Sequence, residues 1–158
     1  MIRTLSKVIS LVLCTISFMS AADDKNEHEL PVEQCNQNSA EACEHIGMYY
    51  TNVVGDDSKA LPFFQKGCEL NAKESCTFSG NIFAYGAVVD KDMEKALNYY
   101  EKGCELKDGI ACNLLGSFYE NGENVDKDQK KAFYYYTRAC NEGDWAQACE
   151  TLKEISDK

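Results

Sequence analysis

The sequence predicts an all-α protein, a right-handed α-solenoid of helix hairpins held together by disulfides. The first observation behind this prediction is a repeat. The stretch Ala96–Tyr119 recurs 36 residues earlier as Ala60–Phe83 and 36 residues later as Ala132–Leu152, and a worn copy begins at Glu33. A fixed period of this length is typical of a stacked array in which each unit buries its apolar face on its neighbours.

The second observation is a pair of cysteines in every copy. Seven residues separate the two cysteines in three copies and eight in the last: Cys35 and Cys43, Cys68 and Cys76, Cys104 and Cys112, Cys140 and Cys149. Eight cysteines permit 105 pairings. Because each pair spans one tight turn between antiparallel helices, the repeat selects these four neighbouring bridges. In the chain-entropy model, each such bridge stabilises the fold by roughly 2.6 kcal/mol.

The N-terminus has the features of an export signal. Arg3 and Lys7 precede an uncharged apolar run from Val8 to Phe18, and small residues follow before Asp23. The run is too short to span a bilayer. We therefore expect residues 1–22 to be a secretory signal peptide that removes Cys14. The mature protein would be periplasmic or secreted and would contain no transmembrane segment.

Composition limits the partners. The full chain contains 16 basic and 26 acidic residues. The expected signal peptide holds two of the basic ones, so the mature chain has 14 against 26, a net charge of −12. Nucleic acid is not expected as a partner, because its phosphates require a basic face. The even number of cysteines in an exported chain favours disulfides over metal binding or thiol redox chemistry. We predict no metal and no cofactor.

The remaining elements follow in order. A flexible leader over residues 23–32 precedes a single repeat domain, 33–158. We place its repeats at 39–72, 73–108 and 109–144, and a C-terminal capping helix at 145–157. Apolar periodicity predicts these helices: Val32–Asn36, one beginning at Ser39, Ser58–Leu70, Ser75–Tyr85, Met93–Leu106, Ala111–Tyr119 and Gln129–Asn141. Their N-caps include Asp56 or Asp57, Asp92 and Asp128, which can accept free backbone N–H groups.

Three glycines recur in the middle of helices, at positions 47, 80 and 116. Each costs roughly 1 kcal/mol compared with alanine. We expect them to let the backbone of a facing helix approach closely. Pro62 is predicted to lie inside its helix, where it removes one hydrogen bond. The tyrosines Tyr99, Tyr100 and Tyr134–Tyr136 are interpreted as core between repeats.

The run ACNLLGSFYENG followed by DKDQKKAFYYY resembles a Sel1-like repeat, a relative of the tetratricopeptide repeat. With its cysteine pairs, the chain resembles the Helicobacter cysteine-rich protein family over about residues 33–152. Three departures suit terminal caps: a first interval of 33 residues, the longer last cysteine spacing, and Lys153 in place of a fourth helix glycine.

The resemblance implies two alternative functions. Family members are described as penicillin-binding proteins with weak β-lactamase activity, which implies a β-lactam or peptidoglycan-like ligand. The wider Sel1-like class implies a scaffold, here a monomer, that binds a protein or peptide partner. The mature chain has no S-x-x-K, S-D-N or K-T-G motif, and His28 and His45 are too few for a zinc β-lactamase. Any catalytic residues therefore stay unknown, and both alternatives remain open.

The resemblance also implies a binding surface. In helical solenoids of this kind, the first helix of each repeat lines a concave groove, and residues beside the helix glycine face it. By position these residues are Glu44, Met48, Thr77, Asn81, Tyr85, Asn113, Ser117 and Asn121. Their amides and hydroxyls suit hydrogen bonding to a peptide or a glycan. The alternative is that they only solvate the inner surface.

Overall fold

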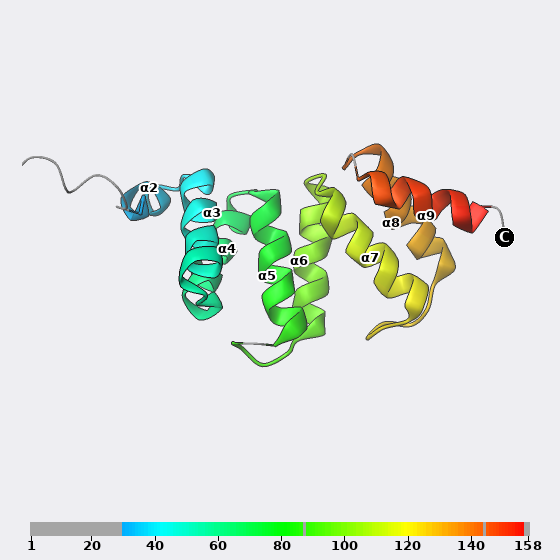
Figure 1. The fold of residues 1–158 in the computed structure, drawn as a ribbon, viewed down its shortest axis with the longest axis horizontal. Helices are drawn as coiled ribbons and strands as arrows, with labels where there is room; N and C mark the ends of the chain where they lie inside the picture. The colour runs from blue at the N-terminus through cyan, green and yellow to red at the C-terminus, as the bar shows by residue number, and fades with distance from the viewer. Residues whose placement is uncertain (1–29, 87, 144, 157–158) are drawn as a thin grey trace, which may run out of the picture. The chain divides into compact units, whose positions relative to one another are not determined.

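The computed structural model describes residues 30–86, 88–143 and 145–156. The repeats form one compact unit, residues 31–158. The predicted signal peptide, 1–22, and most of the predicted leader lie outside the described residues. Every regular element in the described part is a helix, and successive helices run antiparallel as hairpins (Figure 1). The predicted all-helical solenoid of disulfide-linked hairpins is confirmed.

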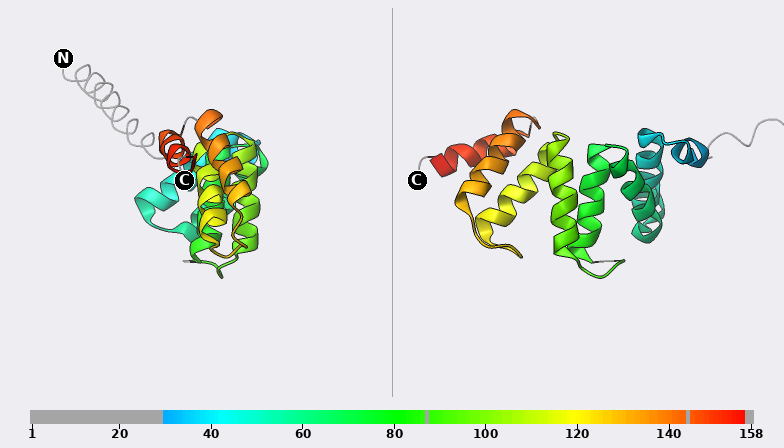
Figure 2. Two further views of the ribbon diagram at one scale, coloured as in Figure 1. Left: turned by 90° about the vertical axis from the view of Figure 1, so that its right-hand side faces the viewer. Right: turned by 180° about the vertical axis from the view of Figure 1, so that it is seen from behind.

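The two further views show the same succession, each helix packed beside the next along the chain (Figure 2). The observed helix ends differ from the predicted ones by no more than two residues. In chain order the elements are α2 (Val32–Asn36), α3 (Ala40–Tyr49), the π-helical turn η1 (Tyr50–Val54), α4 (Asp57–Glu69), α5 (Lys73–Tyr85), α6 (Met93–Glu105), α7 (Gly109–Asn121), α8 (Gln129–Asn141) and α9 (Ala146–Ser156).

Polar caps define where the helices begin. The side chains of Asp56, Asp92 and Asp128 each accept a hydrogen bond from backbone N–H groups in the first turn of α4, α6 and α8. The cap of α4 is therefore Asp56 rather than Asp57. The hydrogen bond from the Ser58 hydroxyl, together with Lys59, lowers the pKa of the Asp56 carboxyl to about 2.

The glycine positions pack against aromatic rings. A Cβ on Gly47 would lie 2.6 Å from the ring of Phe64, and a Cβ on Gly80 would lie 2.6 Å from that of Tyr100. At Gly116 the neighbouring ring is Tyr136, at 2.7 Å. Real Cβ atoms do not approach so closely, so these helices require glycine here. The expectation of a close backbone approach was wrong, because a side-chain ring fills the space.

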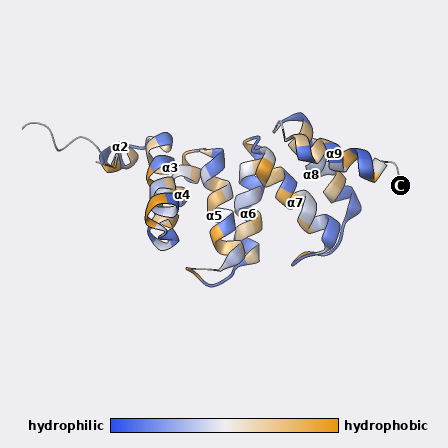
Figure 3. Ribbon diagram, in the orientation of Figure 1, coloured by the Kyte–Doolittle hydropathy of each residue, from blue (hydrophilic) through white to orange (hydrophobic). Residues whose placement is uncertain are grey.

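The core lies between the helices. Hydrophobic and hydrophilic residues alternate around each helix (Figure 3), and the apolar side faces the neighbouring helices. The aromatic ring that packs on the helix glycine is buried in each repeat. Phe64 and Tyr100 are fully buried, and Tyr136 is nearly so. Those aromatics pack with small residues that are themselves buried: Ala60, Ala96, Ala111, Ala132, Ala139 and Ala148.

Disulfides join each hairpin to the next. Every bridge links the last turn of one helix to the beginning of the following helix, with Cα–Cα distances of 4.6–4.9 Å: Cys35–Cys43, Cys68–Cys76, Cys104–Cys112 and Cys140–Cys149. The three bridges with a sequence separation of eight and the one with a separation of nine connect the helices in the same way. The bridges therefore lock consecutive repeats against each other rather than closing a single hairpin.

The shortened first interval lies in the connection between α3 and α4. Gly55 ends η1 in the left-handed conformation and is followed at once by the cap Asp56. In the second repeat the equivalent glycine, Gly86, lies six residues before its cap, Asp92. The first repeat therefore lacks residues in the loop between the glycine and the cap, and its first helix is extended by the π-helical turn. Pro62 lies inside α4, as predicted.

Candidate binding site

Several side chains predicted to line a groove are engaged within the fold. Thr77 is 5% exposed, and its hydroxyl donates to Asp108, the N-cap of α7. Asn81 is half-buried and accepts a hydrogen bond from the Tyr100 hydroxyl at 2.8 Å. Glu44 accepts from the Ser75 hydroxyl at 3.2 Å, and its burial raises the pKa of its carboxyl. These three side chains therefore support packing between helices.

The other predicted groove residues are more open. Tyr85 is 77% exposed at the end of α5. Asn121 donates to Ser117 at 3.2 Å, Asn113 is half-buried, and Met48 packs against the core. None of the eight predicted side chains lines a pocket that described residues of α4, α5 and α6 form.

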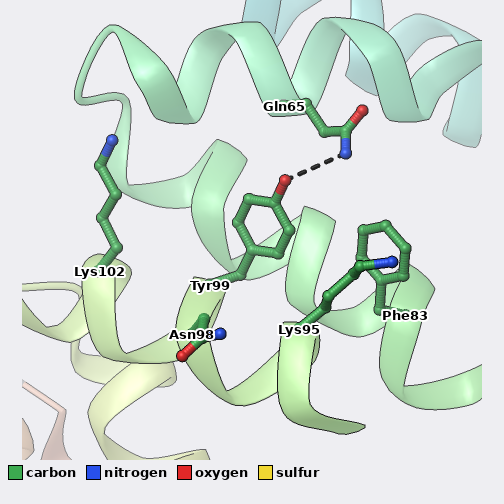
Figure 4. A pocket seen from close by; sticks show the side chains of 6 residues that line it. All are labelled: Gln65, Phe83, Lys95, Asn98, Tyr99 and Lys102. Atoms are coloured by element: carbon green, nitrogen blue, oxygen red, sulfur yellow. Dashed lines mark hydrogen bonds between the residues drawn. The ribbon is translucent and has the colours of Figure 1, made fainter. Parts of the chain in front are cut away.

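That pocket lies between α4 and α6, on the second helices of two repeats (Figure 4). Its volume is about 470 Å³, within the range of small-ligand pockets. Phe83 of α5 also contributes to it. The six lining residues are Gln65, Phe83, Lys95, Asn98, Tyr99 and Lys102. They include two lysines and no carboxylate.

Aromatic stacking builds the wall of the pocket. The rings of Phe83 and Tyr99 stack with their centroids 5.7 Å apart and their planes within 6°. The Lys95 ammonium lies 5.3 Å from the Phe83 ring centroid and 3.1 Å from the Asp92 carboxylate. Gln65 donates from its amide to the Tyr99 hydroxyl at 3.0 Å. The hydroxyl proton of Tyr99 is therefore not used in that bond.

Lys102 differs from the basic residues at the same position in the other repeats. Lys66, 36 residues earlier, donates to the carbonyl of Asn36 at 3.4 Å. Arg138, 36 residues later, donates to the carbonyl of Cys104 at 3.1 Å and to Glu142 at 3.2 Å. Within the part of the chain that the structure describes, the side chain of the half-buried Lys102 makes no hydrogen bond or ion pair. Its ammonium is available to a ligand.

The next repeat contains an equivalent arrangement between α6 and α8. Tyr119 and Tyr135 stack at 5.7 Å and 6°, and the Lys131 ammonium lies 4.6 Å from the Tyr119 ring centroid. Here Glu101 replaces Gln65, and the Tyr135 hydroxyl donates to it at 3.5 Å. Burial, with Glu101 nearby, raises the pKa of the Tyr135 phenol to about 12. The equivalent site therefore contains its own carboxylate.

Sequence reasoning placed the site on the first helices and did not identify this pocket. The sequence did contain a signal for it. Aligned at 36 residues, the second helices repeat a basic residue at two positions: Lys59, Lys95 and Lys131, and Lys66, Lys102 and Arg138. Whether each cation finds a partner depends on the neighbouring repeat, and only the structure shows that.

All eight cysteines of the described repeats form disulfides. The described residues contain no cluster of three or more side chains suited to hold a metal ion. In the same residues, no helix is long and apolar enough to cross a membrane.

Comparison with known proteins identifies similar chains. The Sel1 repeat family model matches residues 40–71, 73–108 and 109–144. The structure is similar to Helicobacter pylori cysteine-rich protein B, with 31% identity and a TM-score of 0.60, over 77% of this chain and 95% of that one. It is also similar to a Sel1 repeat protein from Oxalobacter formigenes, with 28% identity and a TM-score of 0.70, over 78% of this chain.

A third similar structure is a protective antigen of uropathogenic Escherichia coli, with 24% identity and a TM-score of 0.69, over 78% of this chain. That likeness shows the fold alone. The chain spans 51% of the Oxalobacter protein and 27% of the Escherichia coli antigen. No curated protein sequence matches the chain.

Proposed function

Because the chain belongs to the Sel1 repeat family, we propose that it is an exported scaffold that binds a segment of a partner protein. Stacked helical repeats of this kind present extended binding surfaces. The disulfides support the same conclusion, since they hold consecutive repeats in a fixed relation. A surface fixed in this way loses less conformational entropy when a ligand binds.

The observation that carries the proposal is the pocket between α4 and α6. It combines a stacked aromatic pair, Phe83 and Tyr99, with an unpaired ammonium at Lys102. Apolar surface with a few placed polar groups is the usual composition of a ligand site. A volume of about 470 Å³ gives room for a side chain of a bound peptide.

Export is supported by the cysteines. Disulfides persist in oxidising compartments, such as the periplasm or the extracellular medium. Four bridges in one small domain therefore favour a location outside the cytoplasm. The predicted signal peptide at residues 1–22 is consistent with this location.

The competing proposal is a weak β-lactamase, or a protein that binds peptidoglycan fragments. Acyl transfer requires an activated nucleophile such as serine or cysteine. The six residues of the pocket include neither. No specific observation favours hydrolysis, so it serves as the alternative outcome of the test.

Selection from a random peptide library displayed on phage tests the proposal. The oxidised protein is the target, and binders to the reduced protein are removed. We expect enriched peptides that compete with one another and that lose binding when Tyr99→Ala removes the aromatic wall. Nitrocefin hydrolysis and binding of soluble muropeptides are measured with the same protein. Hydrolysis or muropeptide binding, with no enriched peptide, would overturn the scaffold proposal.

A further inference from the structure

We infer that the pocket between α4 and α6 recognises a carboxylate attached to an apolar group of the ligand. This inference rests on the proposed function, because it specifies which chemical group the scaffold binds. The pocket lies on the second helices of the repeats, away from the polar residues of the first helices that the sequence resemblance implied.

The first argument is the charge of the lining. The chain has 26 acidic and 16 basic residues, yet the pocket is lined by two lysines and no acid. Lys95, Tyr99 and Lys102 are spaced by four and three residues on α6, so they share one face of that helix. Figure 4 shows the two lysines on either side of Tyr99. The Lys95 ammonium is paired with the Asp92 carboxylate, so an anion at the Tyr99 hydroxyl would meet the unpaired charge of Lys102 on one side.

The second argument is the supply of unused donors. Lys102 has no partner among the described residues. The Tyr99 hydroxyl accepts from Gln65, which leaves its own proton to be donated. Both groups are suited to an ionised acceptor, and hydrogen bonds to charged groups are stronger than neutral ones. A neutral amide ligand could use the same donors only at lower strength.

The third argument comes from the equivalent site between α6 and α8. There the tyrosine proton goes to the carboxylate of Glu101. The basic residue at the Lys102 position, Arg138, already donates to a backbone carbonyl. In that site the protein's own carboxylate and carbonyl oxygens accept hydrogen bonds from the tyrosine and the basic residue. In the α4–α6 pocket the equivalent donors, Tyr99 and Lys102, have no such acceptor. The comparison indicates that an external carboxylate takes this role in the α4–α6 pocket.

The size of the pocket indicates the rest of the ligand group. A volume of about 470 Å³ is much larger than a carboxylate alone. The Tyr99 ring, stacked on the buried Phe83, provides an apolar wall beside the donors. The recognised group is therefore a carboxylate next to an apolar or aromatic moiety. A C-terminal apolar residue and an acidic side chain beside an apolar one both provide this arrangement.

The test uses two probes that differ only in charge, 3-phenylpropionate and 3-phenylpropionamide, titrated into the ¹⁵N-labelled oxidised protein. We expect the acid to bind about tenfold more tightly than the amide. Lys102→Met should abolish that preference, and Lys102→Arg should retain it. Lys66→Met removes the same charge at the same repeat position and should leave the preference for the acid unchanged. Because the Lys102 side chain makes no hydrogen bond or ion pair with the described residues, its variants should keep the helical content and melting temperature of the parent.

Two peptides distinguish the sources of the carboxylate. One is Ac-Gly-Gly-Phe with a free C-terminus, and the other is Ac-Gly-Asp-Phe-Gly amide. Whichever binds more tightly identifies the source, and the C-terminal amide of the first peptide is its control. Equal binding of acid and amide, no saturable binding of either, or an equal loss in Lys66→Met would overturn the inference. If phage-selected peptides still bind in those cases, the scaffold proposal stands and only the carboxylate assignment fails.

Discussion

The α4–α6 pocket and its equivalent between α6 and α8 share one architecture and differ in a few side chains. Both contain a stacked aromatic pair with planes 6° apart and a lysine over the first ring. They differ at four lining positions, where Gln65, Phe83, Asn98 and Lys102 of the first correspond to Glu101, Tyr119, Tyr134 and Arg138 of the second. The shared residues build the repeat, whereas under our proposal the differing ones decide whether the site takes a ligand.

The difference is electrostatic as well as steric. In the second site, Arg138 is half-buried and lies 6.0 Å from the Tyr134 ring while donating to Cys104. Glu101 supplies the acceptor for Tyr135. Glu101 and Arg138 therefore both have polar partners within the fold. In the first site Lys102 has no such match. An internal repeat therefore allows structural and functional residues to be separated within one chain.

The largest expected effect tests whether the two junctions are structurally equivalent. Replacing Cys68 and Cys76 by alanine, or Cys104 and Cys112, removes one bridge beside each site. We expect each double variant to lose about 2.6 kcal/mol of stability, which lowers the melting temperature by about 10 °C. Thermal unfolding followed by circular dichroism measures both. Losses that differ by more than about 1 kcal/mol would contradict the equivalence of the two junctions.

A second effect concerns the glycine–aromatic contacts. Gly80→Ala and Gly116→Ala each place a Cβ within 2.7 Å of a tyrosine ring. Overpacking costs up to about 3 kcal/mol, and the better helix propensity of alanine returns about 1 kcal/mol. We expect a net loss of about 1–2 kcal/mol for both variants in urea unfolding. A stabilised variant would show that the ring moves without cost.

Much of the fold could be predicted because period and cysteine spacing are encoded locally. The caps Asp92 and Asp128 and the helix Gln129–Asn141 follow from patterns within one repeat. The ring that fills the space at Gly80 could not be predicted, because it comes from another helix. The same holds for the burial of Thr77 against Asp108 and for the unpaired Lys102, since both depend on the neighbouring repeat.

A third prediction converts the first site towards the second. Gln65→Glu places a carboxylate beside Tyr99, as Glu101 lies beside Tyr135. The new carboxylate should take the tyrosine proton and attract Lys102, so we expect about tenfold weaker binding of 3-phenylpropionate by calorimetry. Glu101→Gln is the matched control and should not weaken it. Unchanged affinity in Gln65→Glu would show that the pocket does not bind the carboxylate.

The smallest effect concerns the lysine in each site. Lys95→Met removes an ammonium that lies 5.3 Å from the Phe83 ring centroid. Lys131→Met removes one that lies 4.6 Å from the Tyr119 ring centroid. Cation–π contacts at exposed positions contribute about 0.5–1 kcal/mol. We expect both variants to lose no more than this in urea unfolding. A clearly larger loss at Lys95 would mean that it has a structural role that Lys131 lacks.

The most direct measurement is a ¹H–¹⁵N correlation titration of the oxidised protein with 3-phenylpropionate, because it reports both sites in one experiment. We predict saturable shifts at the lining residues of the first site and none at the second. The residues expected to shift are Gln65, Phe83, Lys95, Asn98, Tyr99 and Lys102. Equal shifts at Glu101, Tyr119, Lys131, Tyr134, Tyr135 and Arg138, or shifts confined to Asn81 and Asn113 on the first helices, would contradict the account.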